Sequence, residues 1–417
     1  MSSLQMQPAP SNTNSTRVEV IDRNSEDDET FVRVRDLLDF SNAPGEWNTG
    51  ELPTIREQTS ALRKLLDPQE IERPLSHSLL AYQGSKATLR MLNAAAGGYD
   101  DPMTLTRTAL SQLAQRVLPG RGLAFVDGLR RIGASGQQLS EINWNLFLQQ
   151  QSRHPALLRT VKLPGQPVRS VRAVLSQKYA IVDNLDVLDA LLDNEEAARL
   201  PVISVKITED AMRVRLALDP NLMNASDALN FDALTKRPIP MIEVWNSEVG
   251  KASVNVQVGT YRVLCANGMT GWGGDSSHWR WNHSGNGNAN ERISNGISDA
   301  LKSARVIAEG MVEAQVASTS VAIDDAFALM TQWANGTLTK TQIATAQQCM
   351  SDETSGPKNS LASIVEGLTL AAQSEGDLFE QRSVEQFASR VLQRGLIIAR
   401  NSDNAIRNVR DTSVGEA

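Results

Sequence analysis

The sequence has no apolar run long enough to cross a membrane, which takes about 18 or more consecutive apolar residues. Residues 1–16 also lack the basic and apolar segments of a secretory signal. Only two cysteines are present, Cys265 and Cys349, and two are too few for a disulfide framework. We therefore expect a cytoplasmic protein with no membrane partner and no structural disulfides.

The common catalytic signatures are absent as well. The sequence holds no Walker phosphate loop, no nucleophile elbow, no His-Glu-x-x-His zinc motif and no Rossmann glycine fingerprint. Cys265 ends an apolar strand pattern, which favours a small buried hydrophobe over a nucleophile. A non-enzymatic role without a cofactor is favoured, although an enzyme of an uncommon class stays open.

Charge is unevenly distributed along the chain, whose net charge is −7. Residues 1–52 hold 10 acidic and 4 basic residues, and residues 307–417 hold 14 acidic and 8 basic. Residues 53–306 hold 24 acidic and 29 basic residues. No acidic residue occurs from 142 to 182, where the six basic residues are Arg153, Arg159, Lys162, Arg169, Arg172 and Lys178. The acidic ends therefore flank a mildly basic middle.

Hydrophobic periodicity predicts an α+β fold. We expect an acidic, largely disordered tail over 1–52, a helical subdomain over 53–153, an α+β core over 154–290, C-terminal helices over 291–400 and a tail over 401–417. One apolar helix face, from 105 to 117, ends at Pro119-Gly120. Another helix is predicted over 139–150, with Ser140 as its N-cap.

The core pattern changes period at residue 168. A helix is predicted over 181–192, capped by Asp183 or Asn184. Strands are predicted at 202–207, 212–218, 241–245, 253–258 and 260–265, and Asn267-Gly268 suits a turn. Their alternation is typical of a mostly antiparallel sheet with one buried face. Long helices are expected over 291–333, with a break near 318–320, and as a pair over 361–374 and 384–398.

Four short pieces of this core share one resemblance. They are Val171–Tyr179 (VRAVLSQKY), Asp183-Asn184, Trp245–Gly250 (WNSEVG) and Tyr261–Met269 (YRVLCANGM). Together they resemble the phage/plasmid-like family called domain of unknown function 932, over residues 100–375. The resemblance implies occurrence on phages, prophages and plasmids, and it implies no particular activity. The acidic N-terminal tail and the loop over 270–290 match no part of the family pattern.

That loop contains five glycines and three of the seven tryptophans. Lysine and arginine neutralise phosphates, and an exposed tryptophan stacks on an unpaired base with about 1–3 kcal/mol per base. We therefore predict a site for single-stranded nucleic acid made of Arg153, Arg159, Lys162, Arg169, Arg172, Lys178, Tyr179, Arg262, Trp272, Trp279, Arg280 and Trp281. The alternative is that Trp279 and Trp281 pack back onto the protein while the basic residues are merely solvated. The prediction requires the basic run and the loop to share a face.

Two further candidate sites are weaker. Asp275, His278 and His283 could ligate a metal ion, but their spacing fits no standard zinc pattern, so a polar surface loop is favoured. Glu248 lies in the Trp245–Gly250 piece, where a structural turn is favoured over a catalytic carboxylate.

Three functions remain open. The leading hypothesis is a homo-oligomeric protein that binds single-stranded nucleic acid in phage or plasmid DNA metabolism, such as recombination or annealing. Its acidic tails would compete with DNA for the basic residues or recruit basic partner proteins. The second is an interaction or structural protein with phage or host partners, such as an anti-host-defence factor or a minor virion component. The third is a metal-dependent nucleic-acid enzyme that uses Asp275, His278, His283 or Glu248.

Overall fold

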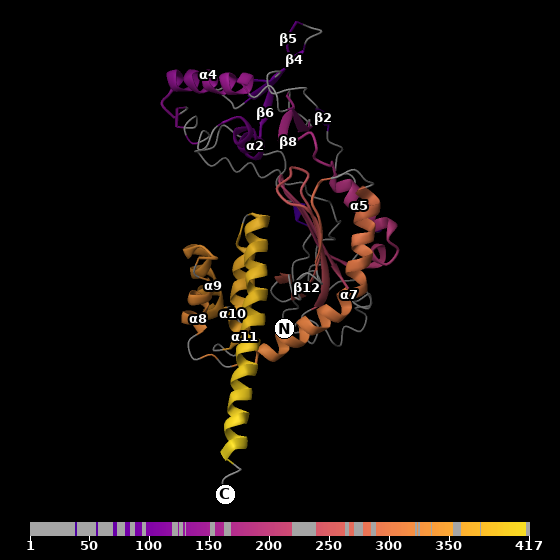
Figure 1. Cartoon of the computed structure of the whole chain (residues 1–417), viewed down its shortest axis with the longest axis vertical. Helices are drawn as coiled ribbons and strands as arrows, with labels where there is room; N and C mark the ends of the chain where they lie inside the picture. Colours follow the sequence, from indigo (N-terminus) through magenta and orange to yellow (C-terminus); the bar gives the residue numbers. More distant parts are fainter. Residues whose placement is uncertain are drawn as a thin grey trace, which may run out of the picture.

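The fold combines two β-sheets with packed helices, as the computed structural model in Figure 1 shows. It describes residues 38–39, 56, 70–72, 80–83 and 88–93, and most of residues 97–413. The longer gaps within that span are 119–130 (three residues of which are described), 151–154, 162–167, 219–238, 263–266, 271–277, 285–288 and 353–359. The predicted tail over 1–52 lies outside the described residues, apart from strand β1. The predicted α+β class is confirmed.

The central sheet has seven strands: β1 (Leu38–Asp39), β9 (Val202–Ile207), β10 (Met212–Ala217), β11 (Ile239–Asn246), β12 (Val254–Arg262), β13 (Asn267–Thr270) and β14 (His278–Trp281). All neighbours are antiparallel, in the order β1-β9-β10-β11-β12-β13. β14 pairs with Val254–Gln257 of β12, and β13 pairs with Gly259–Arg262, so both lie on the same side of β12. Asn267-Gly268 begins strand β13 and is not the predicted turn.

One face of the central sheet is apolar. Val214, Val244 and Val256 point to this face and pack against α5 (Asn184–Asp193) and α7 (Ala289–Ser318). The predicted cap of α5 is confirmed at Asp183, whose backbone N–H donates to Asp186 Oδ2 at 2.7 Å. A short 3-10 helix, Ala197–Arg199, follows α5. This packing holds the largest apolar core cluster of the described residues.

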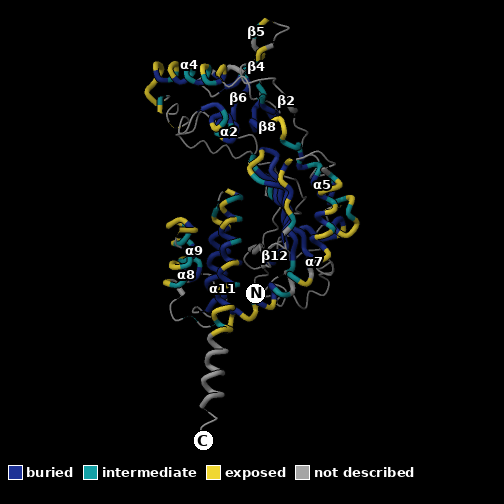
Figure 2. Tube along the Cα trace, in the orientation of Figure 1, coloured by how far each residue is buried: buried dark blue, intermediate teal, exposed yellow. Residues whose placement is uncertain are grey.

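The opposite face is buried too, although the strand alternation predicted a single buried face. Arg213, Arg215 and Glu243 on this face are at most 2% exposed. The C-terminal helix α11 (Leu378–Ser413) lies along this side, while α5 and α7 lie on the other (Figures 1 and 2). Alternation reports which strand positions are polar. It does not report whether a distant helix covers them with matching charges.

A second, N-terminal sheet contains β2 (Glu70–Glu72), β3 (Leu80–Gln83), β4 (Thr88–Asn93), β5 (Gly98–Tyr99), β6 (Met103–Leu105), β7 (Ala156–Val161) and β8 (Ser170–Ser176). Its order is β2-β7-β8-β6-β4-β3, with β5 on β4, and only β6 and β8 are parallel. α2 (Arg107–Val117) and α4 (Ala134–Gln150) pack on it through Leu113 and Trp144.

In the described part of the segment over 53–153, strands β2 to β6 accompany the helices α2 and α4. The helix that ends before Pro119-Gly120 is confirmed as α2, but β2 to β6 were not predicted. These strands have two to six residues each, which is too short for a clear alternating pattern. α4 begins at Ala134, so Ser140 is a buried residue inside the helix and not its N-cap.

Four C-terminal helices form a third cluster: α8 (Ala326–Ala334), α9 (Lys340–Asp352), α10 (Leu361–Gln373) and α11. The predicted break near 318–320 is confirmed, because α7 ends at Ser318. α9 was not predicted, and α11 continues through the expected tail as far as Ser413. Leu368, Phe387 and Leu392 contribute to the apolar core of this cluster. None of the helices described combines the length and apolarity that a membrane crossing requires.

Replacing Gly296 of α7 by alanine should destabilise the fold. A Cβ at this position would lie 2.3 Å from Trp279 Cδ2, so the indole would have to move. We expect a loss of about 1–3 kcal/mol in the free energy of unfolding, measured by urea denaturation, despite the better helix propensity of alanine. Gly310→Ala is the control in the same helix, because nothing lies near its Cβ. It should be neutral or stabilise by up to about 1 kcal/mol. Equal effects of the two changes would contradict the packing of Trp279 on α7.

Candidate functional site at the junction of the two sheets

The structure separates the basic residues that the sequence grouped into one site. Arg159 on β7 and Arg172 on β8 are buried. Arg169 is half-buried, and Lys178 and Arg280 are exposed. Arg153, Lys162, Trp272 and the side chain of Arg262 lie outside the described residues. Two of the residues predicted to bind phosphate, Arg159 and Arg172, are therefore buried.

The tryptophans of the loop over 270–290 pack inward. Trp281 is buried in the core between the central sheet and α7, and Trp279 is partly buried against the same core. The guanidinium of Arg292 lies 5.6 Å from the Trp281 ring. These two rings do not form the exposed stacking pair that the sequence predicted. The register of β14 explains this, because Trp281 lies opposite Val254 on the apolar face.

The basic run and the loop nevertheless meet. Tyr179 and Ser284 form an isolated antiparallel bridge, and Ala180 N donates to His283 O at 3.1 Å. The Tyr179 and His283 rings stack with centroids 4.7 Å apart and planes 9° apart. The next ring is Trp281, 6.2 Å from His283. The two segments are thus neighbours, joined by a mostly buried column of rings.

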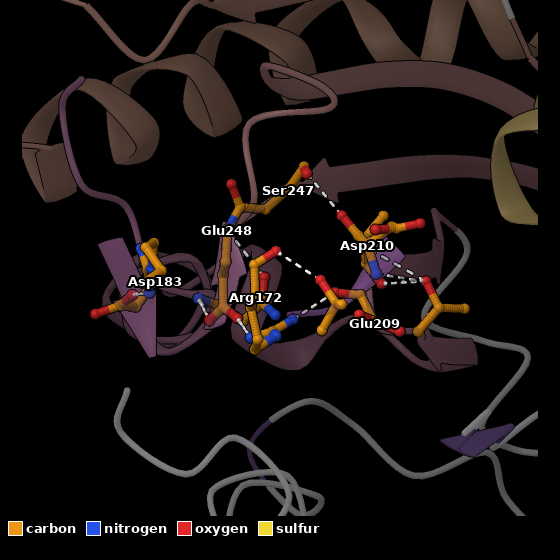
Figure 3. Close-up of polar contacts among 12 residues, drawn as sticks. Arg172, Asp183, Glu209, Asp210, Ser247 and Glu248 are labelled. Carbon is orange, nitrogen blue, oxygen red and sulfur yellow. Dashed lines mark hydrogen bonds and ion pairs between the residues drawn. The ribbon is translucent and has the colours of Figure 1, made fainter. Parts of the chain in front are cut away.

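A buried ion pair connects the two sheets at this place (Figure 3). Arg172 Nη1 donates to Glu248 Oε2 at 2.7 Å, and Arg172 Nη2 donates to the backbone oxygen of Glu209. In the β7–β8 register, Arg159 faces Ala173 and Thr160 faces Val171, which leaves Arg172 as a bulged residue. A bulge changes the direction of a side chain, and here it places an N-terminal-sheet guanidinium beside the central sheet.

Glu248 also holds the start of α5. Its Oε1 accepts the backbone N–H of Asn184, the first helical residue, at 2.8 Å. Burial raises the pKa of the Glu248 carboxyl, but Arg172, Arg159 and this N–H together outweigh burial and hold the pKa below its usual value. The carboxylate therefore stays ionised at neutral pH. It stabilises the positive end of the helix dipole and the arginine at the same time.

The rest of the Trp245–Gly250 piece has structural partners too. Asn246 Nδ2 donates to Val182 O and to Asn184 Oδ1, at 3.2 and 2.9 Å. Ser247 Oγ donates to Asp210 O at 2.6 Å. Gly250 has φ +75°, and a Cβ there would lie 2.7 Å from Leu175 Cδ2. The favoured interpretation of this piece as a structural turn agrees with each of these contacts.

Arg159 forms a second ion pair at the junction. Its Nη2 donates to Asp183 Oδ1 at the start of α5. Tyr179 lies nearby, and its hydroxyl donates to Ser247 O at 3.1 Å. Burial is the main reason that the pKa of this hydroxyl is raised, so it remains a neutral donor. Both arginines are thus used to join chain segments.

Glu209 and Asp210 complete the cluster and were not predicted from the sequence. Asp210 Oδ1 accepts from Thr108 Oγ1 of α2 at 2.7 Å, and Asp210 Oδ2 accepts from Lys251 Nζ. Burial, followed by the neighbouring Asp210 charge, raises the pKa of Glu209 to about 7. Glu209 is therefore the carboxyl of this site that can exchange a proton near neutral pH. Only the fold brings these residues to Arg172, and no motif marks them.

The predicted metal set finds no support in the described part of the chain. Asp275 and the side chain of His278 lie outside it. His283 is buried with Nδ1 3.2 Å from Ala180 O, and burial lowers its pKa to about 4. No group of three or more His, Cys, Asp or Glu side chains within the described ranges is arranged to hold a metal ion. The contacts described at the junction are ion pairs and hydrogen bonds that connect separate chain segments.

Removing the Glu248 carboxylate should destabilise the protein strongly. Glu248→Ala leaves the Arg172 guanidinium buried without its partner, which typically costs about 3–5 kcal/mol. The measurement is the free energy of unfolding in urea. Glu195→Ala, which breaks an exposed pair with Arg199, should cost under about 0.5 kcal/mol. Similar losses for the two variants would show that the junction pair is not a structural connection.

Neutralising Glu209 should alter the pH dependence of stability. A carboxyl whose folded-state pKa is raised stabilises the fold below its unfolded value of 4.5, and this stability is lost as the pH rises towards 7. Glu209→Gln should therefore match the wild type near pH 5 but exceed it near pH 8 by about 1–3 kcal/mol. Unfolding curves across this range measure the difference, and Glu141→Gln on α4 is the control. A wild-type advantage at pH 8 would contradict the raised pKa.

A comparison with protein families gives one match. The family described as domain of unknown function (DUF932) matches residues 235–363, which include β11 to α9 and the Trp245–Gly250 turn. No curated protein and no solved structure matches the chain. The partners of that turn, Arg172 and Asn184, precede the matched segment. The match supports the family resemblance of the short core pieces, and residues 235–363 of the chain are similar to the domain of unknown function 932 family.

Proposed function

We propose that this protein binds single-stranded nucleic acid through the surface around Tyr179. The observation that carries the proposal is the convergence of three segments, 176–180, 250–253 and 280–284, which we call the junction rim. Tyr179 bridges to Ser284, and the Tyr179 ring lies next to Gly250. These segments contain Lys178, Lys251 and Arg280 and no acidic residue.

The junction rim offers the chemistry that phosphates require. Lys178, Lys251 and Arg280 are exposed, as are Gln177 and Asn282 between them. Lys251 is partly neutralised by Asp210, so Lys178 and Arg280 are the stronger phosphate ligands of the three. Exposed cations provide the sequence-independent part of nucleic-acid affinity.

In the proposed binding mode, the protein contacts the phosphate backbone of the nucleic acid. The buried ring of Trp281 and the partly buried ring of Trp279 are used in the core, which removes base stacking on this pair as the main source of affinity. The affinity of a site based on phosphate contacts falls steeply with salt. The family context favours phage or plasmid DNA metabolism, with recombination or annealing as specific roles. The host cytoplasm and a homo-oligomeric state belong to the same proposal.

An interaction protein is the second candidate, because α4 presents an apolar stripe. Leu139, Ile142 and Leu146 are 50%, 49% and 51% exposed, and Glu141 is the one charged residue in this helix. Such spacing places the three side chains on one side of a helix. A stripe of this kind suits a protein partner. Host or phage proteins would then bind through α4, independently of nucleic acid.

The double variant Lys178→Ala/Arg280→Ala should bind single-stranded oligonucleotides more weakly. Losing two phosphate contacts should lower the affinity roughly tenfold or more near 0.1 M salt and reduce the slope of log K against log salt by about 1.4. Gel shifts or fluorescence anisotropy across a salt series measure both. The control, Arg199→Ala/Lys302→Ala, removes the same charge from exposed positions elsewhere.

Two outcomes would contradict the proposal. One is no binding by the wild type at about 50 mM salt, where phosphate contacts are least screened. The other is an equal loss in the two double variants, which would assign the affinity to overall charge and not to the junction rim. Proteins that a nuclease-treated pull-down retains on the wild type but not on Leu139→Gln/Ile142→Gln/Leu146→Gln would favour the interaction protein.

A further inference from the structure

The face of the central sheet beneath α11 carries cationic and polar side chains. Directly opposite residues of antiparallel strands point to the same face of a sheet. Arg213, Trp245, Asn255 and Arg280 are opposite one another across β10, β11, β12 and β14, so they form one row. Arg280, one of the exposed cations of the junction rim, is the end of this row on β14. The covered row therefore continues from the proposed nucleic-acid surface.

The helix α11 covers this row with complementary groups. Glu385 Oε2 accepts from Arg215 Nη2 at 2.5 Å and lies 3.7 Å from Arg213 Nη1. Arg213 Nη2 donates to Gln381 Oε1 at 3.1 Å. The Arg382 guanidinium lies 4.6 Å from the Trp245 ring and covers its face. One carboxylate of α11 thus neutralises two arginines of the sheet.

Glu243 of the sheet is the carboxylate in contact with Arg215. Glu243 Oε2 accepts from Arg215 Nε at 2.8 Å. Burial raises the pKa of Glu243, but the attraction of Arg215, Arg213 and Arg382 outweighs it and keeps the pKa below its usual value. Without α11, Arg213 and Arg215 would share one neighbouring carboxylate, that of Glu243. This group of three side chains would then carry a net positive charge.

α11 is held differently on its two sides. Towards α10 and the other C-terminal helices it packs through apolar residues such as Phe387 and Leu392. Towards the sheet it packs mainly through ions and amides, with one apolar patch where Leu378 meets Trp245. Polar interfaces between parts of one chain separate more readily than apolar ones, and a buried ion pair adds little net stability because desolvation offsets its attraction.

We propose that α11 is an intramolecular cover on a second polyanion-binding face, in which Glu385 occupies the position of a nucleic-acid phosphate. When α11 is lifted, a nucleic acid bound at the junction rim can also contact Arg213 and Arg215. It also uncovers Trp245, an aromatic face on which a base can stack. This inference rests on the proposed function and adds its regulation, because binding becomes strong when the cover is displaced.

The experiment compares two single-charge variants of the full-length protein. Glu385→Gln keeps the side-chain shape but removes the charge that neutralises Arg213 and Arg215. Glu380→Gln removes the same charge from an exposed position of the same helix. At about 50 mM salt, Glu385→Gln should bind a single-stranded oligonucleotide about tenfold more tightly than Glu380→Gln, with a salt slope steeper by about 1–2. Hydrogen exchange over 378–396 should also be faster in Glu385→Gln.

The outcomes separate the two proposals. If the wild type binds but the two variants have equal affinity and equal exchange, the cover is wrong and the junction rim stands. If no variant binds while exchange over 378–396 is faster in Glu385→Gln, α11 lifts but the polyanion proposal is wrong. Should Glu385→Gln fail to fold, Gln381→Ala takes its place, since it removes a contact to Arg213 without leaving a charge unbalanced. Gln381→Ala should also bind the oligonucleotide more tightly, with a smaller increase in affinity. An unchanged affinity would overturn the proposal that α11 is a cover.

Discussion

The ion pair between Arg172 and Glu248 is the constraint on which the arrangement of the two sheets depends. Three chain segments converge on it: β8 provides the guanidinium, the turn after β11 provides the carboxylate, and α5 begins with an N–H donated to that carboxylate. A buried charge without these partners would be very unfavourable. The bulge at Arg172, the positive φ of Gly250 and the start of α5 therefore have to occur together.

The central sheet uses two kinds of interface with different physical consequences. Its apolar face packs on α5 and α7 through close-packed aliphatic side chains, which contribute most of the burial energy. Its other face and the junction are joined by buried arginine–carboxylate pairs. Such pairs contribute little net stability, but they require their partners to be in place, so they fix which segments meet. Arg159 and Arg172, two of the four arginines between residues 142 and 182, form pairs of this second kind.

Much of the fold was predictable because its signals are local. The strand at Val202–Ile207, the cap at Asp183 and the helix end near Ser318 follow from periodicity and end residues within a few positions. Strands of two to six residues carry no such signal, and β2 to β6 were missed. The site was predictable only in part. The Trp245–Gly250 piece was identified as a turn, but its partner Arg172 is 76 residues away and was interpreted as a surface phosphate ligand.

Trp281 and Arg215 show why the local sequence does not predict whether a side chain is buried. A tryptophan in a glycine-rich loop is expected to be exposed. The register of β14, in which Trp281 lies opposite Val254, instead places its ring in the core. An arginine in an alternating strand has the pattern of a solvated side chain, yet α11 brings a carboxylate to it from 170 residues away. Each outcome was decided by an element that the local pattern does not contain.

The charge balance beneath α11 also determines what could displace it. A partner without negative charge would leave Arg213 and Arg215 buried or solvated without Glu385, and the lost attraction would oppose its binding. A phosphate replaces the carboxylate one for one and adds oxygens that accept from both guanidinium groups. The exchange then keeps the arginines neutralised while α11 keeps its apolar packing on α10. The chemistry of the interface thus favours polyanions over neutral partners as the ligands that open it.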